Sequence, residues 1–426
     1  MNYLEIFDDI VSIAHNDYSG YIDKKGWDNP EPFREKIISL GEAGGLDVHV
    51  LKEIADDYLL DFKDDHMHFI LTASNNTKVY DNGFKARRYE DKLYVTYVGK
   101  ETRLKKGMMI ISLDDIPVKE LSKKYKRQLQ IIGTHPEREK WEPVILKHNK
   151  CMIEDKSGNI FEMELNKYER ESYTPEYSIK ELDKGILLIK LTDFNDDDAI
   201  NGLIEDNHKA LNESKNVIID VRLNRGGSDS AYMKLLDYIF PNELDINELE
   251  TGAMQLNMTE RNYKLRVEWF KRFLSQVDNS DTKRFIEVFI REMDKHKNQG
   301  LVEVDLDDAI TEGKIHGRTK PVNIVILEDV YCGSSGDAFV QLAGMSGKVT
   351  LMGRSSAGIT DYSNIAIQEY GKEMQLWYPT SRISSIDEGK GLNGIGVVPK
   401  IYIPWTPEHI EKDVDIEKAI EYLLSK

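Results

Sequence analysis

Cysteine is scarce in this chain, which has only Cys151 and Cys332, far apart in the sequence. The two form neither a CxxC pair nor a zinc-binding pattern, so a disulfide framework is not indicated. No HExxH motif and no cluster of Cys and His is present, so we expect neither a metal nor an organic cofactor. The chain also lacks any run near the roughly 18 apolar residues that a membrane span requires. We therefore expect no membrane partner.

Positive charge is in deficit as well. Lys and Arg number 57 against 75 Asp and Glu, which gives a formal net charge of −18. The short basic clusters at 123–127 and 147–150 form no long basic face, so we expect no nucleic-acid partner. Residues 1–9 are acidic and amphipathic and lack the basic and apolar regions of a signal peptide. A reduced, cytoplasmic protein is the expectation.

The spacing of apolar residues divides the chain into three regions, of which the first is mostly helical and the second mainly β. In the N-terminal segment 1–75, residues 1–62 are mostly helical in pattern, with apolar residues at helical spacing from Leu4 to Ala14. At 61–69, polar and apolar residues alternate, which predicts a strand that carries two histidines. Residues 76–170 predict a mainly β module, because short strand-like runs alternate with turn residues. Its predicted strands are 92–98, 109–113, 151–154 and 160–165.

The third region, residues 171–426, alternates strands with helices. This is typical of βαβ units around a mostly parallel sheet, so the fold class is α/β. Helical periodicity at about 241–318 interrupts the alternation and predicts a helical insertion that would suit a lid. The predicted strands are 185–191, 216–223, 322–327 and 348–352, and the predicted helices are 196–211 and 230–239.

A serine follows the predicted strand 322–327 where the chain passes through the glycine-containing segment 331–337, YCGSSGD, into a helix. A serine at such a turn projects its hydroxyl from the sheet edge. The next backbone N–H, that of Ser335, can face a developing oxyanion. Ser334 and Asp337 also fit a helix capping box, with Ser334 as the N-cap. The segment alone leaves both interpretations open.

A pair of glycines follows another predicted strand, 216–223. Gly226 and Gly227 would let the backbone approach a ligand closely and would expose N–H groups at the carboxyl end of the sheet. The alternative is an ordinary tight turn. Asp220 and Arg222 lie on a strand expected to be buried, so we predict that their charges have partners.

Four motifs in this order carry a family resemblance. They are DxRxNxGG at 220–227, SxxD at 334–337, GxxxxG at 353–358 and GxGVxP at 394–399. The set resembles the C-terminal processing peptidase family of serine peptidases, which includes the tail-specific proteases and the tricorn core. The resemblance covers most of residues 62–426.

The resemblance implies a crotonase/ClpP-like catalytic domain over 171–426 and a PDZ-like domain over 76–170, after the N-terminal helical segment 1–75. It implies a serine endopeptidase that hydrolyses unfolded or C-terminal protein segments through an acyl-enzyme, with peptides or unfolded proteins as partners. The resemblance leaves open whether the chain forms an oligomer.

The resemblance also assigns the nucleophile and its surroundings. Ser334 takes the place of the nucleophile, and Asp337 stands where the family has an acidic residue, usually Glu. The implied oxyanion hole has one backbone N–H from Gly226 or Gly227 and one from Ser335. The reasoning from the strand–helix junction leads to the same arrangement.

The general base distinguishes two branches of the family. Tail-specific enzymes use a lysine about 25 residues beyond the nucleophile, which must be desolvated, but residues 354–362 contain no lysine. The tricorn-like branch uses a histidine from a motif that resembles Asp-Gly-His-Thr. Here Asp64-Asp65-His66-Met67 occupies that place, so His66 is the predicted base. His68 would share its face of a strand and is the second candidate.

Two departures from the family pattern concern supporting residues. Asn393 stands where the tricorn branch has an orienting glutamate, and nearby Asp387 or Glu388 are candidates to replace it. In the PDZ-like region, Gly83 and Phe84 lie where the family binds a peptide carboxylate. A β module that only packs on the catalytic domain is the alternative there.

Two other functions compete with the peptidase. A non-catalytic protein that binds peptides or apolar ligands on the same scaffold is favoured by Asn393 and disfavoured by the presence of Ser334 and His66. An acyl-CoA enzyme ranks last, because no basic cluster suited to the CoA phosphates lies beside the glycine turn.

Overall fold

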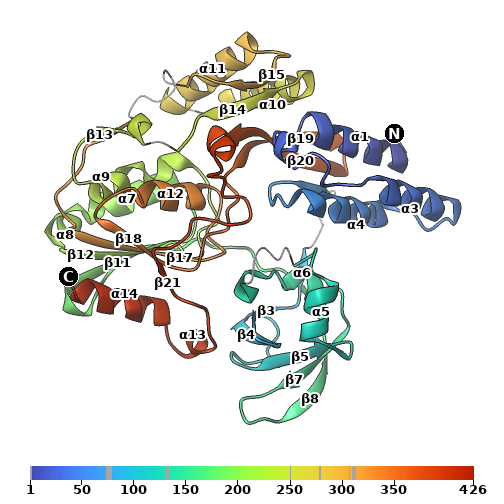
Figure 1. Cartoon of the computed structure of the whole chain (residues 1–426), viewed down its shortest axis with the longest axis horizontal. Helices are drawn as coiled ribbons and strands as arrows, with labels where there is room; N and C mark the ends of the chain where they lie inside the picture. The colour runs from blue at the N-terminus through green and yellow to red at the C-terminus, as the bar shows by residue number, and fades with distance from the viewer. Residues whose placement is uncertain are drawn as a thin grey trace. The chain divides into compact units, whose positions relative to one another are not determined.

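A computed structural model describes residues 2–72, 79–129, 135–249, 251–277, 280–306, 308 and 313–426 (Figure 1). The chain forms two compact units, each assembled from three separate segments. The first comprises Met1–Thr77, Asn242–Gly317 and Gly358–Asn393, and the second comprises Lys78–Pro241, Arg318–Ala357 and Gly394–Lys426. Domain boundaries at 75 and 170 stay a prediction. No helix in the described ranges has the length and apolar character needed to cross a membrane.

The first unit begins with amphipathic helices that cover a sheet. Phe7 and Ile10 on α1 (Tyr3–Asn16) and Tyr58 on α4 (Val48–Leu59) are fully buried with Leu376 and Tyr378 of the sheet. Asn2 and Asp47 cap α1 and α4 by accepting from backbone N–H groups of the first turn. Further helices here are α2 (Tyr21–Lys24) and α3 (Glu31–Glu42). The helical pattern predicted for this region is confirmed.

The sheet of the first unit is antiparallel and has the order β1-β20-β14-β15, with β19 paired to β20. Helices α10 and α11 of the segment 241–318 are confirmed, but this segment also contributes two strands that the sequence did not reveal. The elements are β1 (His68–Leu71), β14 (Met254–Met258), α10 (Glu260–Leu274), α11 (Ser280–Lys295), β15 (Gly300–Glu303), β19 (Tyr362–Tyr370) and β20 (Met374–Ile383).

The strand predicted at 61–69 is wrong over most of its length. A 3-10 helix, η1, occupies Leu60–Phe62, and a turn follows before β1 begins at His68. The turn forms because Asp64 accepts both from the His66 N–H through its carboxylate, at 2.9 Å, and from the Met67 N–H through its carbonyl. His66 therefore lies in a turn, so His66 and His68 do not share a strand face.

One part of the second unit is a small antiparallel sheet of order β3-β4-β5-β7-β8, with β6 paired to β5. The strands predicted at 92–98, 109–113, 151–154 and 160–165 are confirmed. Leu93, Ile110 and Trp141 form its core. The elements are β3 (Phe84–Tyr89), β4 (Lys92–Val98), β5 (Met109–Leu113), β6 (Ile116–Pro117), α5 (Val118–Lys124), β7 (Lys150–Glu154) and β8 (Ile160–Glu164).

The other part of the second unit confirms a mixed helix and sheet fold with a mostly parallel sheet. Its order is β10-β11-β12-β17-β18-β21, and only the β10–β11 pair is antiparallel. The strands are β10 (Tyr177–Leu182), β11 (Ile186–Leu191), β12 (Asn216–Asp220), β17 (Asn323–Glu328), β18 (Val349–Gly353) and β21 (Ile401–Tyr402). The helices are α7 (Asp197–Asp206), α8 (His208–Glu213), α9 (Met233–Ile239), α12 (Ser335–Ala343) and α14 (Val414–Leu424).

Candidate active site

Ser334 lies between β17 and α12, at the junction of strand and helix that the sequence predicted. Its backbone has φ 58° and ψ −125°, a conformation that residues with a side chain rarely adopt. The buried carboxylate of Asp337 accepts from the Ser334 N–H at 3.0 Å. Asp337 therefore stabilises the strained turn at the start of α12.

The glycine pair is required by close contacts. A Cβ on Gly226, which has φ +80°, would lie 2.7 Å from Ser334 Cβ and 3.2 Å from Ser334 Oγ. A Cβ on Gly227 would lie 2.3 Å from the backbone carbonyl of Phe194. The backbone of Gly226 thus lies directly against the Ser334 side chain, which only glycine permits.

The backbone N–H groups of this turn differ in their partners. The Gly226 N–H donates to Asn224 Oδ1 at 2.9 Å. The N–H groups of Gly227 and Ser335 donate to no group within the described ranges of the chain. The Ser335 hydroxyl donates to the Gly227 carbonyl at 2.9 Å, which holds these two residues side by side.

Asn224 is a site residue that was predicted only as part of the DxRxNxGG motif. It is fully buried, and its Nδ2 donates to the Leu191 carbonyl at 3.1 Å. Its backbone carbonyl accepts from the Gly333 N–H at 3.0 Å. Asn224 therefore ties together the end of β11, the glycine turn and the loop before Ser334. A polar residue between a buried strand and a glycine pair was the available signal.

The remaining motifs converge on the same loop. The Ala357 N–H donates to the Cys332 carbonyl at 2.6 Å. Ser356 Oγ accepts from the Val397 N–H at 2.8 Å, and a Cβ on Gly396 would lie 2.0 Å from the Ser356 carbonyl oxygen. Segments 353–358 and 394–399 thus pack on the loop that carries Ser334.

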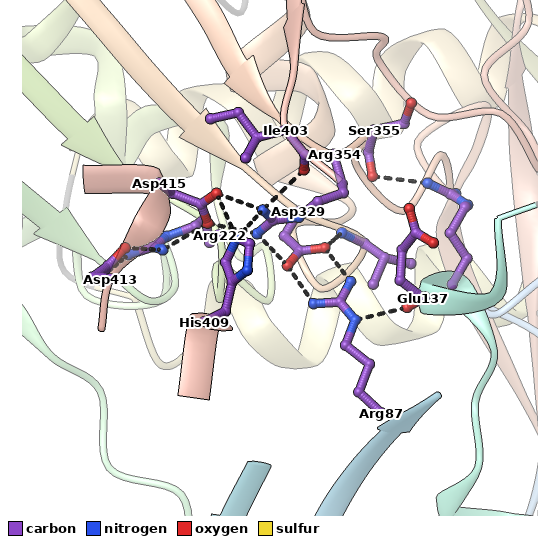
Figure 2. A network of polar contacts seen from close by, with 12 residues as sticks. Arg87, Glu137, Arg222, Asp329, Arg354, Ser355, Ile403, His409, Asp413 and Asp415 are labelled. Carbon is purple, nitrogen blue, oxygen red and sulfur yellow. Dashed lines mark hydrogen bonds and ion pairs between the residues drawn. The ribbon is translucent and has the colours of Figure 1, made fainter. Parts of the chain in front are cut away.

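A buried ionic network holds Asp329, which lies between β17 and Ser334 (Figure 2). Asp329, five residues before Ser334, accepts from both terminal nitrogens of Arg87 on β3 at 2.7 Å and from Arg354 at 2.8 Å. Arg354 also donates to Asp415, which accepts from Arg222. Burial alone would raise the pKa of Asp329, but the charges of Arg354 and Arg87 outweigh it and hold this pKa well below its usual range.

The same network provides partners for the charges of Asp220, at the end of β12, and Arg222, two residues later. Arg222 donates to Asp220 at 2.8 Å and to Asp413 at 2.7 Å, as Figure 2 shows for Asp413. The prediction that Asp220 and Arg222 have partners is confirmed. β12 itself ends at Asp220, earlier than predicted, because the Asp220 carboxylate turns back to accept from the Arg222 N–H.

Glu328, the last residue of β17, contrasts with this network. It is fully buried, and neither of its carboxyl oxygens has a hydrogen-bond partner among the described residues. Burial, assisted by the negative charge of Asp337, raises the pKa of Glu328 well above its usual range. Burial therefore favours the neutral form of Glu328 beside Asp337.

In the first unit, His66 is oriented by a backbone carbonyl. Its Nδ1 lies 2.8 Å from the carbonyl oxygen of Tyr362, the first residue of β19. Since a carbonyl only accepts, Nδ1 carries the proton in this contact, and Nε2 is left with its lone pair. The turn that carries His66 is itself held by the buried Asp64, which accepts from the Tyr18 hydroxyl at 2.6 Å and lies 3.8 Å from Lys24 Nζ.

Asn393 lies in the cluster that supports this turn. Its side-chain Nδ2 donates to the Lys63 carbonyl at 3.1 Å, and its N–H donates to the Asp361 carboxylate at 2.7 Å. The other acidic candidates have partners of their own. Asp387 accepts from Arg382 at 2.8 Å, and Glu388 pairs with Lys390 at 2.7 Å.

The predicted carboxylate-binding residues begin the small sheet. The Gly83 N–H donates to Asp81 Oδ1 at 2.8 Å, and its carbonyl accepts from the N–H groups of Gly99 and Glu101. Phe84, the first residue of β3, is buried in the core of that sheet.

The structure thus gathers Ser334, Gly226, Gly227, Ser335 and Asp337 in the second unit. His66 and Asn393 share one cluster in the first unit, whereas His68 is exposed on β1 opposite Trp377. Within the described part of the chain, no three His, Cys, Asp or Glu side chains are grouped to hold a metal ion.

Comparisons with known proteins identify the family of this chain. The family model of peptidase family S41 matches residues 185–403, more than half of the chain. No curated protein matches. Among solved structures, mature CPAF is similar with a TM-score of 0.69 and 13% identity, over 99% of this chain and 96% of that chain. Mature CPAF complexed with lactacystin gives a TM-score of 0.66 and 13% identity, over 100% of this chain and 97% of that chain. The chain belongs to peptidase family S41 and is a serine peptidase, a hydrolase that acts on peptides or proteins.

Proposed function

We propose that this serine peptidase uses Ser334 as nucleophile and His66 as general base, and that it cleaves unfolded or C-terminal protein segments. The observation that carries the proposal is the strained Ser334 turn, pressed against Gly226 and followed by a helix. Strain of this kind persists where the surrounding structure imposes it and is common at active sites.

The oxyanion hole is formed by the N–H groups of Gly227 and Ser335. Both groups lack a partner among the described residues, whereas Asn224 occupies the Gly226 N–H. The role of Gly226 is therefore steric, since it gives Ser334 room, and Gly227 supplies the donor. Two preorganised donors stabilise the negative charge of a tetrahedral intermediate.

With a histidine as its general base, this enzyme belongs to the tricorn-like branch of the family. His66 Nε2 takes the Ser334 proton while the Tyr362 carbonyl holds Nδ1–H. This carbonyl performs the orienting role that a glutamate has in the tricorn branch. Asn393 and Asp361 act one step further out, since they hold the segment that presents the carbonyl.

The reaction is acyl transfer. Ser334 Oγ bonds to the scissile carbonyl carbon as its proton passes to His66, and the oxyanion faces Gly227 and Ser335. The imidazolium then protonates the leaving amine, and the C–N bond breaks. His66 then deprotonates a water, which attacks the acyl-enzyme carbonyl. The imidazolium returns this proton to Ser334 Oγ as the ester bond breaks, and the product is released as a carboxylic acid that ionises in solution.

The fold-level details are part of the same proposal. The parallel sheet and its helices form the crotonase/ClpP-like catalytic core, and the small β3–β8 sheet forms the PDZ-like domain. The Gly83 N–H already donates to Asp81. A peptide carboxylate bound near Gly83 and Phe84 therefore relies on other N–H groups.

A fluorophosphonate probe tests the proposal because it bonds covalently to an activated serine. We expect labelling of the wild type that is lost in Ser334→Ala and retained in Ser228→Ala, the exposed serine beside the glycine pair. His66→Gln should slow labelling at least about a hundredfold, as expected for a general base, whereas His68→Gln should not. No labelling of the wild type would refute the nucleophile and favour a binding protein. Loss in His68→Gln alone would move the base to His68.

A further inference from the structure

A cavity of about 910 Å³ in the first unit lies between α10 and β19. Its wall on β19 is formed by residues 365–369. Its wall on α10 includes Lys264, Arg266, Trp269, Arg272 and Phe273. None of these residues takes part in the chemistry proposed above. We refer to this cavity as the α10–β19 groove.

Arg266 is the unusual residue of the groove. Its side chain donates to the Ile365 carbonyl at 2.7 Å and to Asn364 Oδ1 at 3.3 Å, but only 8% of the residue is exposed and its Nε has no partner. No carboxylate among the described residues forms an ion pair with it. Burial lowers the pKa of Arg266 to about 10. A buried charge without a counterion is costly, so this site favours an anion that the chain does not supply.

The strand that faces Arg266 is an edge strand. In the described sheet, β19 pairs only with β20. The Ile365 carbonyl points away from β20, since it accepts from Arg266 on α10. Because strand geometry repeats every two residues, the N–H and carbonyl of Ile367 face the same side. An edge of this kind can accept the backbone of an added extended chain.

Aromatic side chains extend the groove along α10. Trp269 and Phe273 are stacked with ring centroids 5.1 Å apart, and they are 40% and 38% exposed. Such a surface suits an apolar side chain of a ligand. The Arg266 guanidinium lies 5.6 Å from the Trp269 ring, so apolar and charged contacts are adjacent.

The other charges limit the ligand further. Arg261 is neutralised by Asp9 at 2.7 Å and Asp17 at 3.1 Å. Lys264 and Arg272 line the groove, but so do three acidic residues, Glu260, Glu268 and Glu369. These carboxylates disfavour a strongly anionic ligand such as nucleic acid. A largely neutral chain with one carboxylate fits the arrangement best.

We propose that the α10–β19 groove binds an extended peptide segment of a substrate, which pairs with the outer edge of β19 and places one carboxylate on Arg266. That carboxylate is either the peptide C-terminus or an Asp or Glu side chain. The use of the groove by substrates rests on the proposed function. β19 begins at Tyr362, whose carbonyl holds His66, and Ile365 follows about 10 Å along the strand. A peptide on this edge therefore leads toward His66.

Fluorescence anisotropy with full-length Ser334→Ala tests the proposal without cleavage. The probe is fluorescein-labelled Thr-Val-Thr-Phe-Glu-Val-Thr-Val with a free C-terminus. Three further peptides carry Gln for Glu, a C-terminal amide, or N-methyl groups on alternate residues. We expect at least about tenfold weaker binding for one of the two neutralised peptides and for the N-methylated one, as charge-assisted and backbone hydrogen bonds are lost. Which neutralised peptide weakens identifies the source of the carboxylate.

Protein variants locate the binding. Arg266→Met should remove the difference between acidic and neutral peptides, and Trp269→Ala should weaken all of them. Lys271→Ala, an exposed cation of α10 outside the groove lining, is the matched control and should bind as the parent does. Loss of the near-UV circular dichroism signal would show that Arg266→Met does not fold. The peptide series and Arg272→Ala, which removes another cation of the groove lining, then test the proposal in its place.

Several outcomes overturn the proposal. Two of them concern the peptides: no binding at all, or equal binding of the acidic and neutral peptides. A third is binding that survives both groove variants. The fourth is a dimer that Trp269→Ala dissociates, which would show that a second copy of the chain occupies the groove. Fluorophosphonate labelling of the wild type is a separate measurement. Labelling without peptide binding would refute the groove alone, and binding without labelling would refute Ser334 alone.

Discussion

Replacement of Gly226 by alanine tests the geometry of the Ser334 turn with a single methyl group. The new Cβ would lie 2.7 Å from Ser334 Cβ, 2.9 Å from the Gly333 carbonyl oxygen and 3.2 Å from Ser334 Oγ. Ordinary van der Waals contact begins at 3.4 Å, so Ser334 or the glycine turn must move. The difference between 3.4 and 2.7 Å sets the required movement at about 0.7 Å. A densely packed interior offers little free space for such a movement.

The cost has two parts. Alanine at φ +80° is strained by about 1–2 kcal/mol, the penalty of the left-handed region for a residue with a Cβ. Overpacking adds about 1–3 kcal/mol. For catalysis the displacement matters more, since a misplacement near 1 Å can cost about a hundredfold in rate. We therefore expect Gly226→Ala to lower the free energy of unfolding by about 2–5 kcal/mol and to slow fluorophosphonate labelling about a hundredfold.

Gly202→Ala is the matched control. Gly202 lies within α7 at a position where a Cβ would meet nothing within 4 Å. Alanine in a helix interior should stabilise the chain by about 0.5–1 kcal/mol and leave labelling unchanged. Urea unfolding measures the first effect and stopped labelling time courses measure the second. A folded Gly226→Ala that labels at the wild-type rate would refute the assignment of Ser334 as the group pressed against Gly226.

Three further predictions follow from the surroundings of Ser334. Asp337→Ala removes the acceptor of the Ser334 N–H and should cost about 1–2 kcal/mol in urea unfolding, as for other helix caps, with slower labelling; unchanged values would contradict the contact. The pKa values of Asp329 and Asp415 are lowered in the fold, so their contribution to stability is present above an unfolded pKa of about 4 and is lost as the pH falls below it; urea midpoints from pH 5 to pH 2.5 should fall less steeply in Asp415→Asn than in the wild type. Burial raises the pKa of Cys151 to about 12 and that of Cys332 well above its usual range, so iodoacetamide at pH 8 should modify neither thiol in the native chain and both in urea, by intact mass; modification of native Cys332 would show that the loop before Ser334 is open.

The second unit was largely predictable because its signals are local. Buried runs such as Val217–Ile219 report a strand covered on both faces, and the turn residues that follow them set where each strand ends. Gly226 and Ser334 stand out for the same reason, since each needs an unusual backbone conformation that restricts residue type. The ordered motifs then connect positions that are about a hundred residues apart.

The first unit was less predictable because its partners are distant in sequence. β14 and β15 are short strands on either side of two helices, and only the pairing of β15 with β14 and of β14 with β20 distinguishes them from loops. The turn at His66 was mistaken for a strand because alternation of polar and apolar residues carries no information about Asp64 as an acceptor. The Tyr362 carbonyl could not be foreseen at all, since a backbone oxygen leaves no trace in the residue type.

That carbonyl changes the significance of Asn393. An asparagine in place of an orienting glutamate would be a serious loss if the side chain had to hold His66 Nδ1–H, because the wrong tautomer cannot accept the serine proton. A carbonyl has only acceptor character, so it fixes the proton on Nδ1 regardless of what stands at 393. It carries no full negative charge, but the buried Asp64 carboxylate lies 3.9 Å from the same Nδ1 and supplies a negative charge beside an imidazolium. Under the proposed mechanism, His66 therefore keeps a correctly oriented Nε2 without a glutamate at 393, and Asn393 contributes to the stability of the loop rather than to the chemistry.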